Sequence, residues 1–69
     1  MEFKLDGREY IELQSLLKVS GLCPSGGAAK IAIVEGQVLV DGEVEIRRGK
    51  KIRAGQKISF DGQEVEVLG

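Results

Sequence analysis

The sequence has no histidine, no tryptophan and a single cysteine, Cys23. One cysteine cannot form an intrachain disulfide, and without histidine the usual ligand sets for structural zinc are missing. The most common general acid–base residue is also absent, and a lone thiol has no imidazole to activate it. We therefore expect no metal, no cofactor and no enzymatic activity, and we interpret Cys23 as a small buried apolar residue.

Long apolar runs are missing as well. No segment approaches the roughly 20 residues that span a bilayer, and the first residues, Met1–Lys4, lack the charged-then-apolar pattern of a secretory signal. We expect a cytoplasmic protein without a membrane partner. A chain of 69 residues fits a single domain over 1–69, because a smaller piece could not bury a useful core. No feature indicates oligomerisation, so we expect a monomer.

The net charge of −1 conceals an uneven distribution along the chain. Residues 1–46 hold four basic and eight acidic side chains, whereas 47–57 hold six basic and no acidic ones, and 58–69 hold three acidic and no basic ones. A concentrated positive segment in an otherwise acidic chain is what local phosphate binding requires. The charge pattern therefore favours a nucleic-acid partner.

Two helices are predicted before residue 36. Apolar residues recur at spacings of three and four from Tyr10 to Val19, which is the period of an amphipathic helix, and Gly21 is suited to ending it. A second helix is expected from Ser25, acting as its cap, to about Glu35. We expect this helix to pack largely against a sheet, with Ile31 and Val34 widening its apolar face.

Strands are predicted at both ends of the chain. Residues 2–5 could form a short strand before the turn at Asp6-Gly7. After residue 36 the period changes to two around an Asp41-Gly42 hairpin turn. Val38, Val40, Val44 and Ile46 alternate there with Gln37, Leu39, Glu43 and Glu45. A second hairpin is expected around Asp61-Gly62. The fold class is therefore α+β, with two helices packed on a small twisted antiparallel sheet.

Two segments are candidates for binding. The first is the basic connection between hairpins, where loops lie at the surface and often carry function; its cations are Arg47, Arg48, Lys50, Lys51 and Arg53. The second is the start of the second helix, where Ser25, Gly26, Gly27 and Lys30 could offer amides and a mobile charge to a phosphate. The alternatives are a solvated charged loop, a serine that only caps, and glycines that only relieve crowding.

Nucleotide-binding motifs are not the explanation for these glycines and this lysine. The P-loop pattern ends in Gly-Lys-Ser/Thr, whereas Gly26-Gly27 is followed by Ala28-Ala29-Lys30, and no G-x-G-x-x-G pattern occurs. We therefore expect no ATP, dinucleotide or other small-molecule substrate.

The chain resembles the S-four RNA-binding domain, also called the αL motif, which takes its name from a small-subunit ribosomal protein. The match covers about residues 10–60, and its most specific part is the spacing from the second helix to the Asp41-Gly42 turn. Within the family it is most similar to short stand-alone bacterial proteins of the YbcJ and YaaA type. The segments that carry the resemblance are Leu16–Val19, Gly21-Leu22, Ser25–Lys30, Glu35–Val38, Val40–Gly42 and Ala54–Gln56.

The resemblance implies a non-enzymatic protein that holds structured RNA, ribosomal or transfer RNA, through the second helix start and nearby basic residues. Gly26 stands where the family commonly has a basic residue, which removes one usual phosphate contact. Because Phe3, Tyr10 and Phe60 fit the core pattern, we expect shape recognition rather than base stacking. The expected RNA-binding residues are Arg8, near the start of the first helix, with Ser25, Gly26, Gly27, Lys30, Arg47, Arg48, Lys50, Lys51 and Arg53.

Three alternatives remain open at this point. A protein-interaction module could use the basic segment to dock an acidic partner, for example in ribosome assembly. A ubiquitin-like sulfur carrier fits the small size, but Leu68-Gly69 does not supply the Gly-Gly tail that such proteins need. An enzyme that uses only carboxylates or lysines is conceivable, but no paired acid–base constellation is visible.

Overall fold

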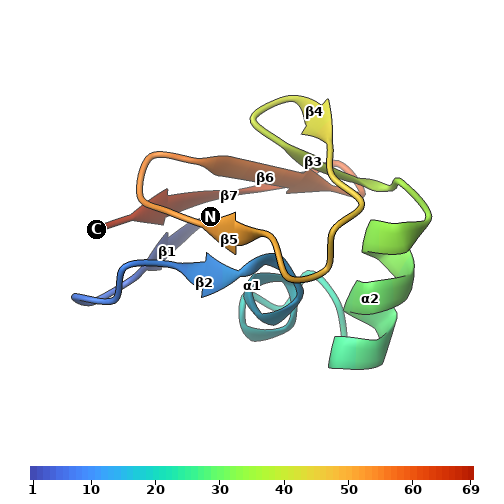
Figure 1. The fold of residues 1–69 in the computed structure, drawn as a ribbon, viewed down its shortest axis with the longest axis horizontal. Helices are drawn as coiled ribbons and strands as arrows, with labels where there is room; N and C mark the ends of the chain where they lie inside the picture. The colour runs from blue at the N-terminus through green and yellow to red at the C-terminus, as the bar shows by residue number, and fades with distance from the viewer.

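The computed structural model describes residues 1–69 and contains two helices and two sheets. The larger sheet has five strands in the order β1-β7-β6-β3-β4, and the smaller one pairs β2 with β5. Figure 1 shows the helices on one side of the larger sheet. The elements are β1 Glu2–Lys4, β2 Ile11–Glu12, α1 Leu13–Val19, α2 Gly26–Val34, β3 Val38–Val40, β4 Glu43–Val44, β5 Lys51–Ile52, β6 Lys57–Phe60 and β7 Gln63–Leu68.

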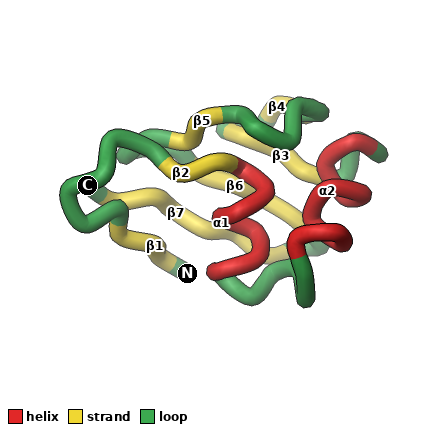
Figure 2. Tube along the Cα trace, turned by 60° about the horizontal axis from the view of Figure 1, so that its bottom comes forward, coloured by secondary structure: helices red, strands yellow, loops and turns green.

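The α+β class and the two helices are confirmed, but the sheet is mixed rather than wholly antiparallel. Strand β1 runs parallel to β7, with Phe3 opposite Val67, while the other pairs are antiparallel. The parallel pair joins the two ends of the chain, as Figure 2 shows. Both hairpin turns are present, and Asp41 and Gly42 have the positive φ values, 51° and 84°, of a tight two-residue turn.

One cluster of 15 buried residues forms the core between the helices and the strands. Leu13, Leu16 and Leu17 enter it from α1, and Ala29, Ala32 and Ile33 enter it from α2. Cys23 belongs to the same cluster, and burial raises the pKa of its thiol. No helix is long and apolar enough to span a bilayer.

The first helix begins later than the apolar spacing predicted. Tyr10 lies outside any element and is 36% exposed, and Ile11-Glu12 forms β2 instead of a helical turn. Strand β2 pairs with β5, with Ile11 opposite Ile52 and both side chains buried. A buried strand pairing thus overrides the local helical period, and Tyr10 is not a core residue.

Five aliphatic side chains assigned to the apolar pattern are exposed instead. Val19, the last residue of α1, is 58% exposed. Ile31 and Val34 are about three-fifths exposed because α2 buries its opposite face against α1 rather than the sheet. The two-residue turn sets Val44 opposite Leu39, and residues opposite each other in neighbouring strands share a face of the sheet. Val44 therefore lies on the other face from Val38 and Val40. Ile46 follows beyond the end of β4 and is also exposed.

Candidate nucleic-acid interface

The basic connection between β4 and β5 is fixed by its backbone, not by its side chains. The amide of Leu13 donates to the carbonyl of Lys50 at 2.9 Å, and the amide of Gln14 donates to that of Arg48 at 3.1 Å. These carbonyls satisfy first-turn amides of α1, because Glu12, the residue before the helix, provides no side-chain cap. The backbone of the loop is therefore held in place by α1, and Arg47 is the one cation of the loop that also has a carboxylate partner.

With Lys51 of β5 and Arg53 just after β5 included, the basic connection holds five cations. Four of these five cations have no carboxylate within salt-bridge distance. Arg48, Lys51 and Arg53 are exposed and Lys50 is half-buried. The single ion pair of the molecule joins Arg47 to Glu45, with Nε and Oε2 2.9 Å apart. The charge of the connection is thus largely uncompensated, except at Arg47.

Glu45 holds Arg47 through three hydrogen bonds. The Nε, Nη2 and backbone amide of Arg47 all donate to the Glu45 carboxylate. The hydrogen bond from the Arg47 side chain lowers the pKa of this carboxyl to about 2, and the burial of Glu45, which acts in the opposite direction, does not offset it. This pair was not predicted from the sequence, although residues two apart in an extended segment share one side.

We expect the Glu45 carboxyl to titrate near pH 2, well below the ordinary value of about 4.3. Because the folded pKa is lowered, the pair stabilises the fold above about pH 4.3, and this contribution disappears as the pH falls through about 2. Carbon-detected NMR of the Glu45 carboxyl measures the midpoint. An Arg47→Gln variant should return it toward the ordinary value; equal midpoints in both proteins would contradict the pairing.

The start of α2 carries the predicted cap. The Ser25 Oγ accepts from the amide of Ala28 at 3.1 Å. The amides of Gly26 and Gly27 donate to no protein acceptor, so they remain available to a ligand. A Cβ built on Gly26 meets nothing within 4 Å, and one on Gly27 meets only the Ser25 Oγ at 3.8 Å. Internal crowding therefore does not explain these two glycines.

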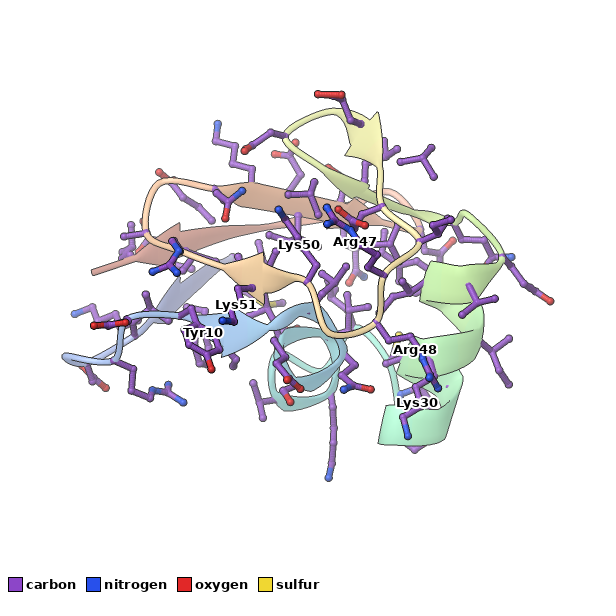
Figure 3. All side chains as sticks on the ribbon, in the orientation of Figure 1. Tyr10, Lys30, Arg47, Arg48, Lys50 and Lys51 are labelled. Carbon is purple, nitrogen blue, oxygen red and sulfur yellow. The ribbon has the colours of Figure 1, made fainter.

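The helix and the basic connection meet through Lys30 and Arg48. These two side chains line one shallow groove together with Ile31, Val34 and Glu35. Figure 3 shows the labelled cations as a band that runs from Lys51, beside Tyr10, through Lys50 and Arg47 to Arg48 and Lys30. The sequence predicted that the connection lies beside the opening turn of α2. The groove instead joins Arg48 to Lys30 and to later residues of α2, and no residue of the opening turn, 25–27, lines it.

Arg8 does not lie where the sequence placed it. It belongs to the turn between β1 and β2, not to the start of the first helix, which is Leu13. Its Nε donates to the carbonyl of Leu5 at 2.9 Å, and its guanidinium lies 5.4 Å from the centroid of the Phe3 ring. Arg8 is thus tied to the β1 end of the molecule.

Tyr10 lies beside the basic connection, where the sequence did not place it. The Nζ of Lys51 lies 5.0 Å from the centre of its ring, and the Cζ of Arg53 lies 5.7 Å from it. Strand alternation explains this arrangement, since buried Ile11 and Ile52 face inward and their neighbours must face outward. The sequence did not reveal it, because Tyr10 and Ile11 also fit the helical spacing.

Comparisons with known proteins identify the family. The S4 domain family model matches residues 3–68. YbcJ of Escherichia coli (strain K12) and YbcJ of Shigella flexneri are each 53% identical over 66 residues, which cover 96% of this chain and 94% of theirs. The solution structure of E. coli YbcJ, described as having an αL motif involved in RNA binding, matches with a TM-score of 0.77 at 51% identity, over 99% of this chain and 86% of that one. The chain therefore belongs to the S4 domain family.

Proposed function

We propose that the protein binds the phosphate backbone of structured RNA, with ribosomal or transfer RNA as the expected target. The observation that carries this proposal is the basic connection itself. Its backbone is fixed to α1, while Arg48, Lys50, Lys51 and Arg53 have no carboxylate partner in the molecule. Membership of the S4 family and the RNA-binding motif described for YbcJ support the same function.

Each part of the interface has a defined task in this proposal. Arg48, Lys50 and Lys51 neutralise successive phosphates, and Lys30 extends the charged surface onto α2. The Gly26 and Gly27 amides receive one phosphate at the positive end of the helix dipole, with Ser25 holding the first turn in shape. Arg47 contributes less because Glu45 already compensates its charge. Arg8 is the outermost candidate, at the β1 end.

The protein acts in this proposal as a monomeric, cytoplasmic, non-enzymatic binding module. Binding is mainly electrostatic, so it selects the shape and phosphate spacing of folded RNA rather than a sequence. No reaction step is required of any side chain.

A titration of the protein with a structured RNA at several salt concentrations tests this function. Four to six phosphate contacts are expected, and the logarithm of the affinity should fall with the logarithm of the salt concentration by about 0.7 to 0.9 per contact. A protein without measurable RNA affinity at low salt, or with affinity independent of salt, would contradict the proposal.

A second candidate function is docking of an acidic protein, favoured by the exposed Ile31 and Val34 beside Lys30 and Arg48. Aliphatic side chains contribute to protein contacts and contribute little to phosphate binding. The same salt titration separates the two candidates, because this one predicts weak RNA binding at every salt concentration.

A further inference from the structure

We infer that Tyr10, with Lys51 and Arg53, forms a subsite for an unpaired base of the bound RNA. This inference rests on the proposed function and narrows its substrate class to duplex RNA that carries an unpaired nucleotide beside the duplex. Tyr10 is the sole tyrosine of the chain and 36% exposed.

The position of the ring follows from the β2–β5 pairing. The register sets Ile11 opposite Ile52 and Glu12 opposite Lys51, which places Tyr10 across from Arg53 just beyond the last pair. Because Ile11 and Ile52 are buried, the flanking side chains share the outer face. The aromatic ring is thus held beside two cations by a short but anchored sheet.

A bound nucleotide can replace the two contacts between the cations and the ring by stronger ones. The cations lie 5.0 and 5.7 Å from the ring centroid, and such contacts are weak at exposed sites. A nucleotide that stacks its base on the ring and places its phosphate on Lys51 and Arg53 exchanges them for a stacking contact and charge-assisted hydrogen bonds.

Carboxylates near the ring do not block this subsite. Glu12 lies on the same outer face, opposite Lys51, but makes no ion pair with it. Its Oε1 instead accepts a hydrogen bond from the Gln14 Nε2 at 3.0 Å. Lys51 and Arg53 thus remain available to the phosphate of the stacked nucleotide.

The test compares three RNA hairpins with the same stem. One is blunt, one has a short single-stranded extension at its 5′ end, and one has the extension at its 3′ end. Wild-type protein should bind one extended hairpin about 5- to 10-fold more tightly than the blunt one, the lower part of the range for one stacked base. Tyr10→Phe should keep this preference. Tyr10→Leu should bind all hairpins equally, with the affinity of wild type for the blunt RNA.

Intrinsic fluorescence adds a direct readout, because the chain has one tyrosine and no tryptophan. Stacking should quench the Tyr10 emission with the extended RNA and leave it nearly unchanged with the blunt one. Equal affinity of wild type for all hairpins, or a Tyr10→Leu loss that is the same for blunt and extended RNA, would overturn the subsite while leaving RNA binding intact. Absence of binding to every hairpin would instead overturn the proposed function, and the subsite with it.

Discussion

Replacing Arg48, Lys50 and Lys51 together by glutamate is expected to weaken RNA binding by at least about 100-fold. Hydrogen bonds to charged groups contribute about 1.5–3 kcal/mol each, and a tenfold change in affinity corresponds to about 1.4 kcal/mol, so three such bonds to phosphate together exceed the free energy of a 100-fold change. The salt dependence should also become shallower, by about 0.7 to 0.9 for each phosphate that is no longer neutralised. Filter binding or fluorescence anisotropy at fixed salt measures the affinity, and its repetition over a salt series measures the slope.

The fold should tolerate these three replacements. The connection is held by the carbonyls of Arg48 and Lys50, and no side chain of the three makes an ion pair. The matched control reverses Lys4, Lys18 and Lys57, which are exposed and lie outside the basic connection, and reaches the same net charge. If both triple variants bound RNA equally weakly, general repulsion rather than this surface would be responsible.

Replacing Gly26 and Gly27 by alanine is expected to change stability and binding in opposite directions. The fold has space for both methyl groups and neither glycine has positive φ, so helix stability should rise by up to about 1 kcal/mol per substitution. The same methyl groups keep a phosphate away from the free amides. We expect RNA affinity to fall about 10-fold or more, since each charge-assisted hydrogen bond contributes about 1.5–3 kcal/mol.

Urea unfolding and an RNA titration measure the two effects separately. Gly62→Ala is the matched control, because Gly62 lies in the β6–β7 turn with φ of 76°. Alanine is strained there, so this variant should be less stable, while its folded protein binds RNA as wild type does. Unchanged affinity of the double variant would show that the α2 amides do not contact phosphate.

The parts of the fold that were predicted depend on local signals. Ser25 as a cap, Gly21 after α1 and the two Asp-Gly turns each act within a few residues, and all four are present. The parallel β1–β7 pair could not be predicted in this way, because it joins residues more than sixty positions apart. No local pattern encodes such a partner.

The candidate site was predicted as a set of charges but not as a geometry. The helical period through Tyr10 concealed a strand whose partner, β5, lies some forty residues later. The Glu45–Arg47 pair shows that formal charge overstates what a loop offers to a ligand. Ile31 and Val44 were assigned to the apolar pattern but are exposed. Periodicity shows which residues share one face of a helix or strand, but it does not show which face another element covers.

Amide chemical shifts of the labelled protein, followed during titration with a structured RNA, test most directly where the RNA binds. The largest changes are expected at Gly26, Gly27 and Lys30 and along 47–53, in one saturable process that salt weakens. Changes confined to β1, β6 and β7, with these segments unmoved, would contradict the assignment of the binding surface.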